Sequence, residues 1–176
     1  MKLIIGLGNP GPRYHHTRHN VGYQIVENMF TDWREDLKVK SLISKNPTFL
    51  TIISPILCVQ PQTYMNLSGD AVATLVSFYK LDPRKDILVI SDDIDMEFGK
   101  VRYRSEGSHG GQNGLRDIIA KLGTSEFARI KIGVGRDDRY EVSDWVLSRF
   151  TESEKEIIAT EVTTKVEEYI IKWLCD

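Results

Sequence analysis

Three of the four histidines of this 176-residue chain lie within five positions, at His15, His16 and His19. The pKa of a free imidazole is close to cellular pH, so a histidine at the start of a helix can take a proton from water. His15 and His19 have a four-residue spacing that metal ligands on a helix can show. However, the sequence has no His-Glu-x-x-His motif and no third ligand at a suitable spacing. General-base chemistry is therefore favoured over metal binding, and a capping or surface role stays open.

A carboxylate partner for such a base is available in residues 91–95, directly after the apolar run 87–90 that predicts a buried strand. A helix amino terminus lowers the pKa of a nearby histidine, whereas a carboxylate raises it and selects one tautomer. Three acids in five residues could also bind a divalent cation or form a solvated turn. The residues alone leave these three interpretations open.

Two glycine-rich segments could contact a phosphate or polar groups of a ligand. Residues 6–11 match the G-x-G-x-x-G dinucleotide pattern, but Pro10 removes a backbone donor and the helical pattern begins only at Val21. A nucleotide cofactor is therefore not expected, and a tight turn explains these glycines. Residues 107–114 open a helix and could surround a phosphate or present Asn113 to a carbonyl, although such loops are often only turns.

An amide-rich segment, residues 61–69, precedes another predicted helix. Asn66 or Ser68 is most simply the N-cap of that helix, and no nucleophile motif supports Ser68 as a nucleophile. Farther along the chain, alternating cations predict a strand with one basic face. That face suits either a phosphate or a solvated sheet edge. Its cations are Lys100, Arg102 and Arg104.

The elements that position these groups alternate between strands and helices. Apolar runs and alternating residues predict strands at residues 2–7, 49–53, 56–59, 87–90, 101–103 and 130–134. Helical spacing predicts helices from about residue 20, over residues 71–79, over residues 115–122 before Gly123, and from a capping box at 151–154 to residue 173. This alternation predicts one α/β domain with helices on both faces of its sheet. Ligands of such sheets bind beyond the strand ends.

Composition restricts the class of protein. Hydrophobic residues make up 41% and charged residues 27%, which is typical of a soluble globular chain, and no apolar run approaches the roughly 20 residues of a membrane span. The net charge is −2, but residues 151–176 carry seven acids and three lysines, so residues 1–150 carry +2. An anionic ligand is expected to meet that larger part. Cys58 and Cys175 have no zinc-site spacing and indicate reduced thiols in a cytoplasmic protein.

Several segments together closely resemble bacterial peptidyl-tRNA hydrolase, in the same order and spacing over nearly the whole chain. They are GLGNPG at 6–11, Tyr14, TRHNVG at 17–22, PQTYMNLSG at 61–69, DDID at 92–95 and GGQNG at 110–114. The resemblance implies a single monomeric α/β domain over residues 1–176 with a mixed central sheet. It also implies an enzyme without metal or cofactor that hydrolyses the ester between peptide and tRNA. Relatives on the same fold that bind RNA without catalysis supply the alternative function.

The resemblance also implies roles for individual residues. His19 would activate water, Asp92 would orient and stabilise His19, and Asn9 would contact the peptide main chain and help reject unblocked aminoacyl-tRNA. The tRNA end and the peptide would contact Tyr14, Tyr64, Met65, Asn66 and Asn113. The tRNA phosphates would contact Arg102, Arg104 and Lys131.

The residue chemistry agrees with these implied roles. A positioned base can generate the attacking water, and the amides of Asn66 and Asn113 are the favoured donors to the developing oxyanion. A protein that only binds RNA needs no base, so the intact set of residues counts against the alternative function. Gln112 stands where family members often carry His or Asn, and we expect it to alter only a minor contact. His15 and His16 receive no role.

Overall fold

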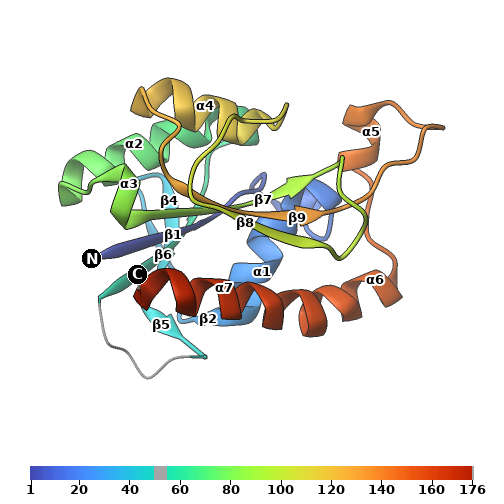
Figure 1. The fold of residues 1–176 in the computed structure, drawn as a ribbon, viewed down its shortest axis with the longest axis horizontal. Helices are drawn as coiled ribbons and strands as arrows, with labels where there is room; N and C mark the ends of the chain where they lie inside the picture. Colours follow the sequence, from blue (N-terminus) through green and yellow to red (C-terminus); the bar gives the residue numbers. More distant parts are fainter. Residues whose placement is uncertain (50–54, 176) are drawn as a thin grey trace.

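A computed structural model of the chain describes residues 1–49 and 55–175. Its central sheet is formed by strands between residues 2 and 133, and the C-terminal part is helical (Figure 1). The strands are β1 (Lys2–Gly6), β2 (Phe30–Thr31), β3 (Arg34–Asp36), β4 (Ser41–Ser44), β5 (Asn46–Pro47), β6 (Ile56–Pro61), β7 (Ile87–Asp93), β8 (Val101–Arg104) and β9 (Ala128–Gly133). Seven of them form a sheet of order β3-β4-β6-β1-β7-β9-β8, and β2 pairs with β5. The inner strands β6, β1, β7 and β9 are parallel, whereas β3, β4 and β8 each run antiparallel to a neighbour. The mixed sheet is confirmed.

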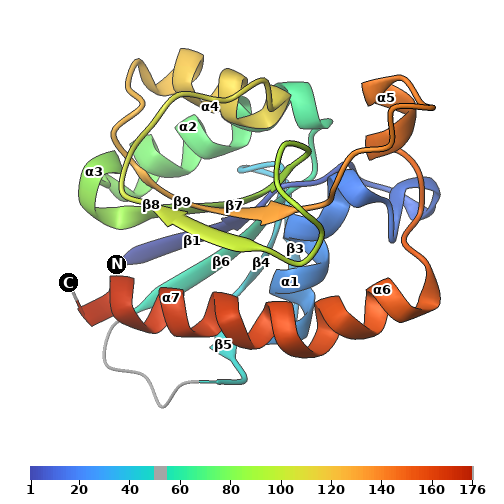
Figure 2. The ribbon, with the colours of Figure 1, turned by 45° about the vertical axis from the view of Figure 1, so that its right-hand side comes forward.

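Helices cover both faces of this sheet, as Figures 1 and 2 show. The α-helices are α1 (Val21–Met29), α2 (Ser68–Tyr79), α3 (Pro83–Asp86), α4 (Asn113–Leu122), α5 (Val142–Val146), α6 (Glu152–Ile157) and α7 (Thr163–Cys175). Short 3-10 turns occupy Pro12–Tyr14, Arg18–Asn20 and Met65–Leu67, and a π-helical stretch, Ile158–Val162, joins α6 to α7. α1 and α7 lie on one face, and α2 and α4 lie on the other. The single α/β domain with two helix layers is therefore confirmed.

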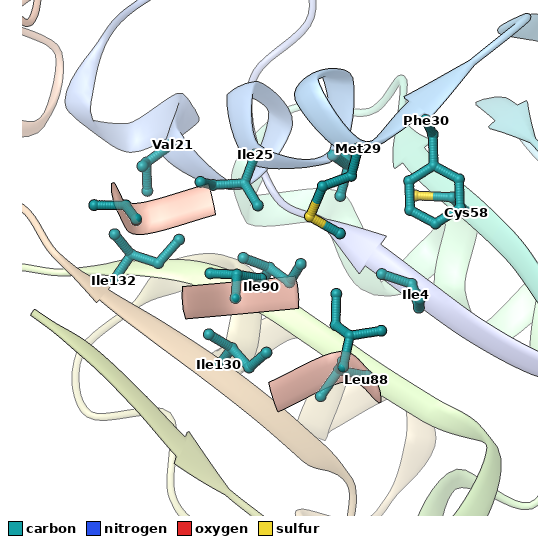
Figure 3. Close-up of a cluster of buried hydrophobic side chains, with 14 of the residues drawn as sticks. Ile4, Val21, Ile25, Met29, Phe30, Cys58, Leu88, Ile90, Ile130 and Ile132 are labelled. Atoms are coloured by element: carbon teal, nitrogen blue, oxygen red, sulfur yellow. The ribbon is translucent and has the colours of Figure 1, made fainter. Parts of the chain in front are cut away.

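Alternation along the strands divides the core into two clusters. In β7, Leu88 and Ile90 face α1 and α7, while Ile87 and Val89 face α2 and α4. Figure 3 shows Val21, Ile25 and Met29 of α1 over the side chains of β7 and β9. Because both faces of the parallel strands are buried, residues 3–5 of β1 and 87–90 of β7 are all apolar, whereas β9 includes Arg129 and Lys131.

Glycines allow α1 to lie very close to the sheet. A Cβ at Gly6 would lie 2.4 Å from the carbonyl oxygen of Gly22, and a Cβ at Gly22 would lie 2.5 Å from that of Ile90. A Cβ at Gly8 would lie 2.7 Å from the Tyr23 ring. Close packing of strand and helix therefore accounts for the first two glycines of the dinucleotide-like pattern.

The predicted elements largely agree with the structure, with specific corrections. β7 continues through Asp93, because residues 91–93 pair with β9, so the acidic segment is not wholly a turn. α1 ends at Met29, because Phe30 begins β2. Phe49 lies in a bend, and the rest of the strand predicted at 49–53 falls outside the described residues. Neither Asn66 nor Ser68 caps α2.

None of the helices in the described ranges combines the length and apolar character that a membrane span requires. The final helical region begins with the predicted capping box, in which Thr151 and Glu154 bond reciprocally. Its buried positions include Ile158, Val162 and Trp173, which pack on the sheet as predicted.

Candidate active site

The candidate site lies where the chain leaves the carboxyl ends of the parallel strands. Asn9 and His19 follow β1, Met65 follows β6, and Asp92 is near the end of β7. Since these parallel strands are neighbours in the sheet, residues distant in sequence meet at one edge. α5, which follows β9, lies beyond the same edge (Figure 2).

The structure brings His19 and Asp92 into direct contact. His19 Nδ1 lies 2.8 Å from Asp92 Oδ2, and the two side chains are only 12% and 3% exposed. Next to a carboxylate, Nδ1 carries the proton and donates it, so Nε2 is the nitrogen that can accept another. The pair therefore holds the imidazole in the tautomer that a general base requires.

Two opposing effects set the pKa of His19. Burial disfavours the charged imidazolium and lowers the pKa, but the charge of Asp92 and its hydrogen bond favour the imidazolium. The second effect prevails, and the pKa of His19 is raised above its ordinary value of 6.5. Of the two effects that the sequence suggested, the structure places the raising one, the Asp92 carboxylate, in direct contact with His19.

The second oxygen of Asp92 is held by Gln112. Gln112 Nε2 lies 3.0 Å from Asp92 Oδ1 and 3.2 Å from the sulfur of Met65. Gln112 Oε1 accepts from the backbone N–H of Leu115 at 2.7 Å and so caps α4. The expectation of a minor contact at Gln112 is wrong, because its amide bonds directly to Asp92.

Asn9 is fixed by backbone and side-chain bonds on both sides. Its Oδ1 accepts from Met65 N at 2.7 Å, its backbone N–H donates to Asn20 Oδ1, and its carbonyl accepts from Asn20 Nδ2, both at 2.9 Å. Because the side-chain oxygen of Asn9 is engaged by Met65, the orientation of its amide is fixed, and the Nδ2 group is the hydrogen-bond donor that Asn9 can offer to a ligand. Asn20 was missed as a site residue, although it directly follows His19 within the motif at residues 17–22.

A cavity of about 530 Å³ opens beside the His19–Asp92 pair. Charged residues, the glycine-rich loop and α5 contribute to its lining, which includes His19, Asp92, Asp93, Asp95, Gly110, Gln112, Asn113, Lys131, Arg136, Val142, Ser143 and Val146. Asn9 and Asn20 instead line a smaller cavity of about 180 Å³, together with His15 and Glu27. The carboxylate of Glu27 lies 3.5 Å from His15 Nε2.

Four predicted substrate contacts lie outside the lining of the larger cavity, namely Tyr14, Tyr64, Met65 and Asn66. Tyr14 and Tyr64 meet edge to face, with ring centroids 6.3 Å apart, and Tyr64 is 55% exposed. Asn66 is also exposed. Of the two favoured oxyanion donors, only Asn113 lines the cavity, and its Oδ1 accepts from Arg116 at 3.1 Å.

The predicted basic face is present on β8 and β9. Their pairing places Arg102 opposite Lys131 and Arg104 opposite Arg129. Arg102 and Arg104 are exposed, whereas Lys131 is mostly covered and forms an ion pair with Asp93 at 3.2 Å. Arg129 is fully buried, and this burial lowers its pKa to about 10. The face therefore offers two freely accessible guanidinium groups and one partly covered ammonium group.

A second missed residue, Arg18, attaches the segment of His19 to the C-terminal part of the chain. Its guanidinium bonds both carboxylate oxygens of Glu154, at 3.1 and 3.2 Å. It also lies 4.1 Å from the ring centre of Trp145 and 4.9 Å from that of Phe150. Since Trp145 belongs to α5, this contact links His19 to the helix that lines the cavity.

The acidic residues at the end of β7 bond to protein groups. Asp92 contacts His19 and Gln112, while Asp93 contacts Lys131 and the backbone N–H of Asp95. Within the residues that the structure describes, no three His, Cys, Asp or Glu side chains are gathered as a metal site. These contacts favour the interpretation of Asp92 as the partner of a base.

Comparison with known proteins gives one consistent family. The family model described as peptidyl-tRNA hydrolase matches residues 3–176. A peptidyl-tRNA hydrolase of Chloroflexus aggregans is 47% identical over 94% of this chain and 88% of its own length. One of Fusobacterium nucleatum is 44% identical over 99% and 90%. The crystal structure of peptidyl-tRNA hydrolase from Acinetobacter baumannii has a TM-score of 0.80 at 32% identity, covering 98% of this chain and 92% of that one.

Proposed function

The chain belongs to the peptidyl-tRNA hydrolase family, and on this basis we propose that it hydrolyses the ester bond between the peptide and the tRNA of peptidyl-tRNA. The observation that carries the proposal is the buried His19–Asp92 pair, whose imidazole borders a cavity of about 530 Å³. A positioned imidazole is the group that ester hydrolysis by water needs most.

In the proposed reaction His19 Nε2 takes a proton from a water molecule as the water oxygen bonds to the ester carbonyl carbon. Asp92 stabilises the imidazolium that forms, because its carboxylate already accepts from Nδ1 at 2.8 Å. The carbon–oxygen bond to the ribose then breaks, and the imidazolium returns the proton to the ribose oxygen. The products are a free peptide acid and a free tRNA hydroxyl.

Amide groups near the pair serve the acyl part of the substrate. Asn113 lines the cavity and is placed in the proposal as a donor to the developing oxyanion, with Asn66 as a second donor after substrate binding. Asn9 directs its Nδ2 group to the peptide main chain and helps to reject an unblocked amine. Met65 orients this group, because its backbone N–H donates to Asn9 Oδ1, and Met65 would also contact the substrate.

Cations and aromatic rings serve the tRNA part. Arg102 and Arg104 are exposed on one strand face and would pair with phosphates, and Lys131 would join them from the edge of the cavity. Tyr14 and Tyr64 would contact the tRNA end. We propose further that the protein acts in the cytoplasm as a monomer.

The alternative is a protein of the same fold that binds RNA without catalysis. A buried base with a raised pKa favours hydrolysis over this alternative. The test compares release of an N-acetylated amino acid with release of an unblocked one from tRNA, in the presence of a metal chelator. Hydrolysis of the blocked substrate alone is expected. Tight tRNA binding without release of either group would support the alternative.

A further inference from the structure

The carboxylate of Asp92 is held at both oxygens by side chains from distant parts of the sequence. Oδ2 faces His19 Nδ1, and Oδ1 accepts from Gln112 Nε2 at 3.0 Å. Asp92 is only 3% exposed, so little solvent competes for either oxygen. A carboxylate bonded at one oxygen alone can rotate about its Cβ–Cγ bond, whereas one bonded at both has a fixed plane.

Gln112 is itself held in place by several contacts. Its Oε1 accepts from Leu115 N at 2.7 Å as the N-cap of α4, and its Nε2 also reaches the sulfur of Met65 at 3.2 Å. A Cβ at Gly114 would lie 2.6 Å from that same sulfur, which shows how closely α4 packs on Met65. The amide that meets Asp92 is therefore attached to a helix and not to a freely moving loop.

We propose that Gln112 is a positioning residue for the hydrolysis, because its amide fixes the plane of the Asp92 carboxylate and thereby the orientation of the His19 imidazole. The inference rests on the proposed function for its effect on rate. Loss of the amide leaves Asp92 free to turn away from Nδ1, so the base is correctly oriented for a smaller fraction of the time.

An amide is suited to this position because it donates without carrying charge. The cavity already has acidic groups close to Asp92, namely Asp93 and Asp95, and cations at Lys131 and Arg136. Lys131 is engaged by Asp93 at 3.2 Å. A glutamate at residue 112 would place another negative charge against the His19–Asp92 pair.

Two variants separate the donor from the helix cap. In Gln112→Ser the hydroxyl still caps α4, since serine is a favourable N-cap, but it is too short to reach Asp92. In Gln112→Glu the side chain keeps its length and its capping oxygen, but it loses the donor and gains a charge. Thermal unfolding of each variant checks that α4 and the fold are retained.

For Gln112→Ser we expect kcat on blocked aminoacyl-tRNA to fall about 10- to 100-fold, which is the size of effect seen when an outer side chain that orients a functional residue is removed. KM should change little, because Gln112 acts on the base and not on the bulk of the substrate. For Gln112→Glu the extra charge favours the imidazolium, so the acid limb of the kcat profile should move to higher pH. The matched control is Asp82→Ala, which removes the cap of the distant helix α3 and should leave kcat unchanged.

The titration of His19, followed by NMR in each variant, gives a readout that does not depend on turnover. A higher pKa of His19 in Gln112→Glu, with a lower kcat in Gln112→Ser, supports the positioning role. Unchanged kcat in Gln112→Ser together with an unchanged His19 titration in Gln112→Glu would overturn it. If the natural chain releases no peptide from tRNA, the proposed function fails, while the NMR titration still decides whether Gln112 acts on the pair.

Discussion

The candidate site has two regions that differ in burial and in bonding. The first, the buried network, is a continuous series of contacts made by His19, Asp92, Gln112, Met65, Asn9 and Asn20. The second, the exposed set, consists of Tyr64, Arg102 and Arg104. Groups of the network are held by one another without a ligand, whereas groups of the exposed set are open to solvent.

This difference separates chemistry from recognition. Prearranged dipoles and bases need no reorganisation during the reaction, which is how active sites lower a barrier most effectively. Exposed guanidinium groups contribute little interaction energy until they meet an anion. We therefore expect changes in the buried network to lower kcat and changes in the exposed set to raise KM.

The largest effect is expected for His19→Ala. Removal of a general base typically costs about 100- to 10,000-fold in rate, so kcat on blocked aminoacyl-tRNA should fall within that range. KM should stay close to its natural value, because the exposed set is intact. Steady-state kinetics give kcat and KM, and thermal unfolding shows whether the variant is folded. A well-folded variant with undiminished kcat would show that another group takes the proton.

The second largest effect on kcat is expected for Asp92→Asn. We expect kcat to fall about 100-fold, because the imidazole loses its carboxylate partner. Without that charge, burial alone acts on His19 and lowers its pKa. The neutral base is active above its pKa, so the acid limb of the profile should move to lower pH. A profile that keeps its natural midpoint would contradict the assignment of Asp92 as the group that raises the pKa of His19.

Asn20→Ala tests whether the network acts as a unit. The change leaves the buried N–H and carbonyl of Asn9 without their partners, which should lower the free energy of unfolding by about 2 kcal/mol. It should also lower kcat, because Asn20 no longer fixes the backbone of Asn9. The control is Asn28→Ala on the exposed part of α1, the helix that follows Asn20; this change removes one side-chain bond, to Thr163. Equal losses of stability in both variants would show that the bonds of Asn20 contribute no more than this single contact.

The smallest effect on kcat is expected for the double change Arg102→Ala and Arg104→Ala. Each phosphate contact that is lost should reduce the slope of log K against log salt by about one. Affinity for tRNA should fall at low salt while kcat stays close to natural. The control is Arg139→Ala, which removes an exposed arginine outside β8 and β9. If this control lost as much salt dependence as the double variant, tRNA binding would depend on the overall charge of the protein and not on the face of Arg102 and Arg104.

Sequence patterns predicted those parts of the fold that depend on local periodicity. The buried strands and the helices α2, α4 and α7 have clear apolar spacing, and the capping box at Thr151 marks a helix start. The edge strand β3, Arg34–Asp36, is wholly polar and gains its structure from pairing with β4. α5 is only five residues long, and too short for a period to be visible.

The proximity of His19 and Asp92 was expected from the sequence, but the other contacts around this pair were not. His19 and Asp92 are 73 positions apart, and only the order of parallel strands brings them together. Gln112 lacked a signal of its own, because a glutamine before a helix is most simply a cap. The Gln112 amide both caps α4 and bonds Asp92, and the bond to Asp92 depends on where β7 ends. Arg18 likewise depends on a carboxylate 136 positions away.

The bond between Arg18 and Glu154 has a consequence for biosynthesis. Protein chains are made from the amino terminus, so the segment of His19 leaves the ribosome long before its counterpart does. Until residue 154 has been added, Arg18 is without its carboxylate, and α5 is not attached beside the imidazole. A growing chain thus acquires a complete reaction centre only after residue 154 has left the ribosome.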